Sequence, residues 1–465
     1  MLSAISDSNK KLSYDCLKCV LQHSDANFRF QLAERFPKIN LAEKAVQLFL
    51  SDFSISEGWF KLNDINYRLG VIRYAREGPT PETIETENRS GGVQTDIDQF
   101  GFEKYSLPEL TPGDILIKDA PRESNDNLEL AEARLVRYQE MLTDLEKEKM
   151  ELENVPETPA KEISIETDQL DRIRISNEVL RREERLKRIN DSIRGTKRNL
   201  GYSGLAVQCY QRKRDNRPFP FEMFIQLTKT SSDGTVYIER FNYDKSLREA
   251  QKYLISKFLG NRQLVTKIKS LRFLPRQREG LIFGLPEGIK LDVQEITTSL
   301  GLADVLQRVE TILEHPNRPF TRLRSGGLTL VDAQNPKIRN ARVLELYNSS
   351  FVECVALCRE VPNKRIVIHS LELHPEQFGV LVENLINTRG TLGTCFEFTG
   401  IQEKDEAREA LSYIAERFET SVAGKRLVTI SLPHQQLNIS YAAYRCNPRI
   451  LEYTIKMEVV QSHSN

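Results

Sequence analysis

The sequence predicts a mixed α/β fold: a small mixed sheet with an inserted antiparallel coiled-coil helical hairpin, followed by an irregular, leucine-rich-repeat-like arc of βα units. Three observations predict this fold. Heptad-spaced apolar residues mark two long helices in the middle of the chain. Alternating apolar residues mark strands on both sides of these helices, and strands alternate with helices in the C-terminal part.

The two central helices are predicted by apolar residues that recur in steps of three and four, which gives each helix one apolar seam. Pro156 and Pro159 follow the first helix and should end it. Residues 128–153 contain 8 acidic and 4 basic residues, whereas residues 172–198 contain 10 basic and 4 acidic ones, so the net charges are −4 and +6. We therefore expect the helices to pack side by side, although the same seam is compatible with pairing between two chains. The seam residues are Leu128, Ala131, Leu135, Tyr138, Leu142, Leu145 and Leu152, then Ile175, Val179, Leu186, Ile189, Ile193 and Leu200.

The segments before the hairpin change from helical to extended. Near-helical apolar spacing over residues 12–36 predicts short helices that Pro37 ends. Alternation over residues 46–74 predicts strands, with a turn at Glu57-Gly58. Residues 76–127 are rich in proline and glycine and predict loops, with one short strand near Ile115–Ile117.

A β-hairpin and a helix are predicted after the helical hairpin. Asp233-Gly234 should turn the chain between a strand around Ile225 and a return strand around Ile238. The following helix should start at an N-cap, Asp244, and end at Gly260. Because a two-stranded unit is rarely stable alone, we expect the strand pairs on either side of the helical hairpin to share one sheet.

The C-terminal part predicts a roughly parallel sheet, because a strand pattern returns every 20 to 35 residues or so with helices between several of the strands. The predicted strands are 271–274, 290–293, 328–331, 341–346, 365–373, 393–398 and 426–431, followed by an antiparallel pair at 437–441 and 453–460. The predicted parts of the chain are 11–45 (helical segment), 46–121 (strands and loops), 122–200 (helical hairpin), 201–262 (β-hairpin plus helix) and 263–465 (βα units).

The amino-acid composition limits the classes of protein to which this chain is expected to belong. Lys+Arg and Asp+Glu are equal at 66 each, so no overall field favours nucleic acid or an anionic membrane. The first residues are polar and no stretch of 18 apolar residues occurs, so we expect neither a signal peptide nor a membrane span. Seven scattered cysteines favour reduced thiols, and hence an intracellular protein of the cytoplasm or nucleus.

Candidate chemical groups are better explained by structure than by catalysis. Cys16 and Cys19 form a single C-x2-C pair, whereas a structural zinc site needs four ligands, so we expect both to pack in the core as small apolar residues. Asp96 and Asp98 lie in a glycine-flanked loop, where aspartates cap backbone amides.

Cys354 and Cys358 lie on an apolar helix pattern and are followed by His369 and His374; packing in the core is expected for them. The sequence therefore predicts no catalytic residue, no metal site and no cofactor.

The basic second helix offers an alternative function. Its arginines and lysines are suited to phosphate contacts, but the interleaved aromatic residues of a single-strand binding site are missing. We expect this charge to pair with the acidic helix instead, through Glu140, Asp144, Glu146 and Glu148.

Several phrases resemble a nematode-expanded family of F-box-associated proteins of unknown function. They include LSYDCLKCVLQHSDANFRFQLAERFP, INYRLGVIRYAREGPTP, GGVQTDIDQFGFE, LTPGDILI, FIQLTKTSSDG, YLISKFLGNR, GTCFEFTG and YTIKMEVV, which run from about Lys11 to Val460. An F-box binds a Skp-type adaptor of a cullin ubiquitin ligase through apolar helix faces. The resemblance implies adaptor contacts at Leu12, Leu17, Val20, Leu21 and Leu32. Ser13, Ser24 and Phe36-Pro37 depart from the F-box pattern.

The sequence thus predicts a non-enzymatic protein-interaction module, with a substrate-recognition subunit of a ubiquitin ligase as the leading interpretation. The alternatives are a stand-alone scaffold and a nucleic-acid-binding protein that uses residues 172–198.

Overall fold

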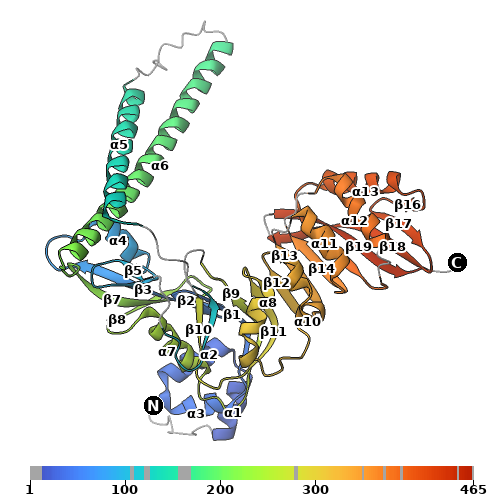
Figure 1. Ribbon diagram of the computed structural model, residues 1–465, viewed down its shortest axis with the longest axis horizontal. Helices are drawn as coiled ribbons and strands as arrows, with labels where there is room; N and C mark the ends of the chain where they lie inside the picture. Colours follow the sequence, from blue (N-terminus) through green and yellow to red (C-terminus); the bar gives the residue numbers. More distant parts are fainter. Residues whose placement is uncertain are drawn as a thin grey trace, which may run out of the picture.

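The computed structural model describes residues 13–104, 109–119, 126–154, 169–276, 281–347, 350–369, 373–387, 391–447 and 450–462. Fifteen of the described strands form one continuous mixed sheet, in the order β16-β17-β18-β19-β15-β14-β13-β12-β11-β9-β1-β2-β3-β7-β8. The chain is therefore a mixed α/β protein, as predicted (Figure 1).

Three helices and a 3₁₀ turn precede the sheet. The side chain of Ser13 caps the first helix at the amide of Cys16 (3.2 Å), and Asp25 caps the second at the amide of Asn27 (2.7 Å). The elements are α1 (Tyr14–Gln22), α2 (Ala26–Arg35), η1 (Pro37–Ile39) and α3 (Asn40–Ala45).

The first strands pair across the inserted helices. β3 and β7 are antiparallel neighbours, so the strand pairs on either side of the insertion share one sheet, as predicted. Helix α7 follows, but Ser246 caps it instead of Asp244, because Ser246 and Glu249 form a capping box. The elements are β1 (Phe49–Ser56), β2 (Trp59–Leu62), β3 (Ile65–Ala75), β7 (Phe221–Thr230), β8 (Val236–Asn242) and α7 (Leu247–Leu259).

Two long helices, α5 (Leu128–Glu153) and α6 (Gln169–Arg214), project from the sheet side by side (Figure 1). α6 continues to Arg214, well past the predicted end near residue 200. The heptad steps also continue, through buried Thr196, Ser203 and Val207, and Gly204 lies against Leu135. Small polar residues at these steps hide the seam from a search for apolar residues. Residues 155–168, with Pro156 and Pro159, lie outside the described part.

The C-terminal strands continue the same sheet. β9, β11, β12, β13, β14 and β15 are parallel neighbours, and β9 also pairs in parallel with β1. The roughly parallel arrangement is as predicted, but β12 lies where no strand was predicted. The predicted strand at 328–331 is wrong: Thr329 and Asp332 form a capping box that starts a short helix there. The strands are β9 (Thr266–Phe273), β11 (Leu291–Thr298), β12 (Arg322–Ser325), β13 (Val343–Tyr347), β14 (Arg365–His369) and β15 (Cys395–Ile401).

Helices connect these strands, and an antiparallel meander ends the sheet. β18 and β19 form the predicted antiparallel pair, and β19 lies beside β15. The helices are α8 (Leu302–Arg308), η2 (Glu310–Ile312), α9 (Leu330–Ala333), α10 (Pro336–Arg339), α11 (Phe351–Glu360), α12 (Pro375–Asn387) and α13 (Lys404–Arg417). The strands are β16 (Ser421–Ala423), β17 (Leu427–Leu432), β18 (Gln435–Asn447) and β19 (Ile450–Gln461).

The segment predicted to be loops is more ordered than expected. It contains a helix, α4, that packs against α6 at Gly201, and its strand β6 pairs with β10 instead of packing irregularly. These elements are α4 (Glu82–Arg89), β4 (Asp96–Ile97), β5 (Glu103–Lys104), β6 (Asp114–Lys118) and β10 (Leu281–Gly284). None of the described helices combines the length and the apolar composition that crossing a membrane requires.

The two faces of the sheet differ in chemistry. Successive strand residues point to opposite faces, so neighbours in register share a face. One register row is apolar and buried, and α8 and α12 add Leu306 and Leu381 to the same core. This row is Leu271, Ile296, Leu323, Leu344, Ile366 and Phe396. The next row lies on the other face and is mostly polar: Arg272, Thr297, Arg324, Glu345, Val367 and Glu397. We call this other side the polar sheet face.

Candidate interaction surfaces

The residues implied to bind an adaptor do not lie on one surface. Leu21 is fully buried in the small core of the N-terminal helices, and Leu17 and Leu32 are half-buried against it. Val20 is 50% exposed, and Leu12 lies outside the described residues. Helical spacing identifies the apolar positions but not which of them the segment uses for its own core. Other large apolar side chains of this segment are exposed: Tyr14, Phe28, Phe36 and Leu41.

A buried ion cluster fixes these helices to the rest of the protein. The Glu43 carboxylate accepts hydrogen bonds from Arg29 Nη2 (3.0 Å) and from Arg262 Nη2 (2.8 and 3.0 Å). All three side chains are at most 3% exposed. Burial lowers the pKa of both guanidinium groups, and the charge of Glu43 opposes that shift.

Lys44 forms a second connection between the N-terminal helices and α7. Its ammonium group donates to the carbonyls of Lys257 (2.6 Å) and Phe258 (2.9 Å) at the end of α7. Burial, together with the charge of Arg262, lowers the pKa of Lys44 to about 8. Two sets of buried polar contacts therefore fix the N-terminal helices to α7 and the loop that follows it.

A hydrogen-bonded cluster occupies the polar sheet face at β12, β13 and β14. The Glu345 carboxylate accepts from Arg324 Nε (2.7 Å), Arg322 Nη1 (2.8 Å) and Tyr347 Oη (2.9 Å), and lies 2.7 Å from His369 Nε2. Burial alone would raise the pKa of Glu345, but the hydrogen bonds from His369 and Arg324 outweigh it and lower that pKa.

The predicted core packing of His369 is wrong. His369 Nδ1 lies 2.7 Å from Thr399 Oγ1, its ring stacks on Tyr347 at 4.3 Å, and its side chain is 21% exposed. The alternation of β14 places His369 on the polar sheet face, whereas its apolar neighbours Ile366 and Ile368 face the core. The cluster satisfies Glu345 internally, which favours a structural and surface-forming role.

Other cations of the polar sheet face also contact carboxylates. Arg272 and Lys61 lie on Asp52 (3.0 and 3.4 Å), and Arg365 lies on Glu397 (3.0 Å). The side chains of Arg272 and Arg365 remain 39% and 50% exposed. The polar sheet face thus presents alternating charges to solvent.

The projecting helices show the predicted seam where their side chains are described. Ile189 and Ile193 are buried, and Leu128, Leu135, Leu142, Leu145 and Leu186 are half-buried. The side chains of residues 169–181, with Ile175 and Val179, lie outside the described part.

Salt bridges across the two helices use Glu146 and Glu148, two of the four predicted acidic partners. Glu146 pairs with Lys197 (3.0 Å) and Glu148 pairs with Arg185 (2.7 Å). Both pairs are largely exposed, so the seam carries most of the packing energy.

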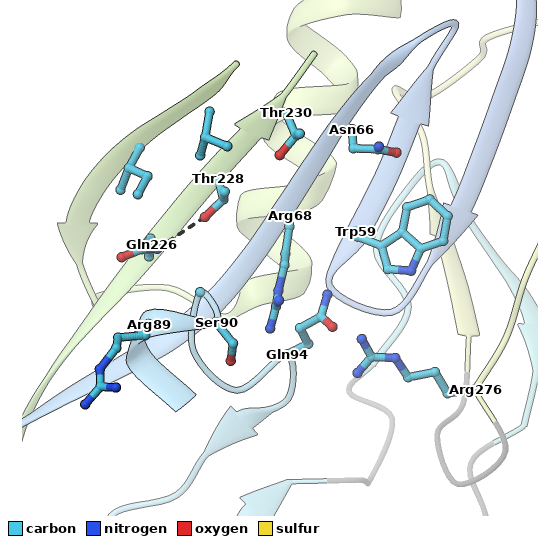
Figure 2. A pocket seen from close by; sticks show the side chains of 13 residues that line it. Trp59, Asn66, Arg68, Arg89, Ser90, Gln94, Gln226, Thr228, Thr230 and Arg276 are labelled. Carbon is cyan, nitrogen blue, oxygen red and sulfur yellow. Dashed lines mark hydrogen bonds between the residues drawn. The ribbon is translucent and has the colours of Figure 1, made fainter. Parts of the chain in front are cut away.

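A polar cavity of about 510 Å³ lies on the polar sheet face at β2, β3, β7 and β8 (Figure 2). No sequence motif marks this cavity. The sequence contains one feature that could have indicated it: polar residues alternate with apolar ones on the paired strands β3 and β7. The lining residues are Trp59, Asn66, Arg68, Arg89, Ser90, Gly91, Gln94, Gln226, Thr228, Thr230, Val236, Ile238 and Arg276.

Asp96 and Asp98 have structural roles. Asp98 Oδ1 accepts from the amides of Phe100 and Phe102 (2.9 Å each), which confirms turn capping. Asp96 instead accepts from Tyr243 Oη (2.8 Å) and from the amide of Leu247 (2.9 Å).

The predicted core positions of Cys16 and Cys19 are wrong: both are exposed, because α1 packs through Leu17 and Leu21 instead. The side chains of Cys354 and Cys358 lie outside the described part, and His374 is exposed. Within the described residues, no three potential ligands gather to hold a metal ion.

Comparison with known proteins identifies one region. Residues 246–402, from α7 to β15, match the family described as a domain of unknown function (DUF3557). No curated protein and no solved structure matches the chain. The matched region holds the parallel strands and the Glu345 cluster, and the match carries no information on F-box association.

Proposed function

We propose that this chain is a non-enzymatic protein-interaction module that acts as the substrate-recognition subunit of a cullin-type ubiquitin ligase. The observation that supports it best is the polar sheet face. Helices bury one side of the parallel strands, while the other side presents charged side chains along successive strands. An extended surface of this kind suits protein recognition. In this proposal the parallel strands form a leucine-rich-repeat-like arc that binds the target.

The N-terminal helices are the proposed adaptor-binding part. They expose Val20, Phe28, Phe36 and Leu41, although the segment has its own core. Exposed apolar groups clustered in one short segment are typical of interaction sites. The Glu43 cluster holds this segment against α7, so a ligase bound at one end would be positioned relative to a target bound on the sheet.

Binding of the purified chain to a Skp-type adaptor tests this proposal, measured by surface plasmon resonance. We expect micromolar or tighter binding that Val20→Asp/Phe28→Asp abolishes. Both residues are about half exposed, so the variant should fold. Val422→Asp is the matched control, because Val422 is an exposed valine on β16. Leu21 is unsuitable for this test, because its truncation would open the small core.

No binding by folded wild-type chain would refute the ligase role and leave a stand-alone scaffold. The scaffold would still use the polar sheet face. Charge reversal at Arg365, which is 50% exposed, should then abolish partner binding, whereas the Val422→Asp control should retain it.

The alternative function is nucleic-acid binding through α6. It is less well supported because Arg185 and Lys197 pair with α5, and Arg182 donates to the carbonyls of Leu152 (2.7 Å) and Glu153 (3.2 Å). A mobility-shift titration at low salt tests it. Binding with a steep salt dependence would favour this alternative, and no binding would exclude it.

A further inference from the structure

The cavity beside Trp59 differs in charge from the rest of the polar sheet face. Elsewhere on this face, arginines such as Arg272 and Arg324 lie against carboxylates. The guanidinium of Arg68 instead donates from Nη2 to the carbonyl of Gly92 (2.9 Å), and its Nε is buried with no hydrogen-bond partner. Among the described residues that line the cavity there is no aspartate or glutamate.

A second guanidinium lies at the same site. Figure 2 shows the head groups of Arg68 and Arg276 both directed toward Gln94. Burial lowers the pKa of Arg68, and the charge of Arg276 lowers it further, as expected for two cations that share one site. Arg89 stands at the rim, where it also contacts Glu85 (3.3 Å).

The carboxylate of Glu57, beside Arg276, is held by two hydrogen bonds. Glu57 Oε2 accepts from the backbone amide of Arg276 (3.0 Å) and from Ser56 Oγ (2.9 Å). Burial raises the pKa of Glu57, and the hydrogen bonds from Arg276 and Ser56 oppose that shift.

The remaining walls of the cavity determine which ligand shapes fit. Trp59 forms one apolar side, and Val236 and Ile238 of β8 form the other. Between them lie the hydroxyl of Thr230 and the amide of Gln94, which offer neutral hydrogen bonds (Figure 2). A volume of about 510 Å³ is in the range of small-ligand sites.

We propose that this cavity binds a phosphate monoester attached to a planar ring, with the phosphate at Arg68 and Arg276 and the ring against Trp59. A phosphate monoester carries close to two negative charges at neutral pH and several acceptor oxygens. Arginine binds such oxygens in pairs, and a buried guanidinium without a counter-ion gains most from an anion.

The experiment uses Trp59 itself, because it is the one tryptophan of the chain. The full chain is titrated with phenyl phosphate, and intrinsic fluorescence reports the cavity directly. We expect a saturable change that weakens with added salt, with much weaker binding of benzoate and of phenol. Competition by phosphotyrosine and by adenosine monophosphate then distinguishes a protein side chain from a nucleotide as the source of the group.

Two variants and one control complete the test. Arg68→Gln should weaken binding at least about tenfold, since hydrogen bonds to charged groups are the strong ones. Asn66→Asp should abolish binding by placing a carboxylate in the cavity, and Asn66 is exposed, so the variant should fold. Arg272→Gln removes a charge from the same sheet face outside the cavity and should change affinity by less than about twofold.

The proposal is overturned if phenyl phosphate gives no saturable signal with folded wild-type chain. Equal affinity of wild type and Asn66→Asp would overturn it as well, because binding would then lie elsewhere. Benzoate binding as tightly as phenyl phosphate would overturn the choice of phosphate. None of these outcomes depends on adaptor binding.

Discussion

Replacing Glu43 by glutamine should detach the N-terminal helices from the sheet. The substitution keeps the size of the side chain but removes the negative charge between Arg29 and Arg262, and these guanidiniums are only 2% and 3% exposed. Breaking a buried ion pair by removing one partner costs about 3–5 kcal/mol, because the other charge stays buried.

The matched control is Glu34→Gln. Glu34 also joins the N-terminal helices to α7, through Lys257 (3.0 Å), but the two side chains are 53% and 46% exposed. An exposed pair of this kind contributes about 0–1 kcal/mol. The structure therefore predicts a difference of about 2–5 kcal/mol between two substitutions of the same type.

Hydrogen–deuterium exchange measured by mass spectrometry resolves this difference locally. Exchange over residues 14–45 and 247–262 should be at least about thirtyfold faster in Glu43→Gln than in Glu34→Gln, since every 1.4 kcal/mol is about a factor of ten. Exchange over β17 to β19 should stay unchanged. Equal exchange in Glu43→Gln and Glu34→Gln would refute the reasoning, because burial would then not decide the value of the pair.

Three further predictions follow from packing and charge. Leu142→Asp should lower the helicity measured by circular dichroism, whereas Glu146→Gln should barely change it, because the seam and not the exposed pair holds α5 to α6; equal losses would contradict this. Gly201→Ala should lower the thermal midpoint although alanine favours helix, because its Cβ would clash with Thr83 Oγ1, and Thr83→Ala should restore the midpoint. Glu345 has a folded-state pKa below its ordinary value of 4.5, so its contribution to stability is present above that pH and is lost as the pH falls below it. Acid unfolding of Glu345→Gln should therefore show a smaller loss of stability over the same pH range, and an identical pH profile would contradict the assignment.

The sequence predicts most strands, because alternation is a local signal. It also predicts that the strand pairs on either side of the helical hairpin share one sheet, because lone hairpins are unstable. It does not predict that Thr196 and Ser203 continue the helix seam, since small polar residues pack there only because α5 approaches closely. It misreads Thr329 as part of a strand, because a capping box is short and its neighbours are apolar.

The candidate site is harder to predict than the fold. Arg68 is one polar residue in an alternating strand, and its environment depends on Gly92 and Arg276, which are distant in sequence. The apolar residues of α1 are predicted correctly as apolar, but only the tertiary packing separates buried Leu21 from exposed Val20. Long-range partners decide both cases, and a single sequence does not reveal them.

Because α6 is one continuous helix, a small rotation near its lower part moves its far end by several ångströms. The helix has 46 residues, which is about 69 Å at about 1.5 Å per residue, and its lower part rests on α4 at Gly201. A rotation of about 5° at that point displaces the Gln169 end by about 4 Å, since the two positions are about 48 Å apart along the helix. α4 leads directly into Ser90 and Gly91 of the cavity. α4 therefore connects the base of α6 directly to the wall of the Arg68 cavity.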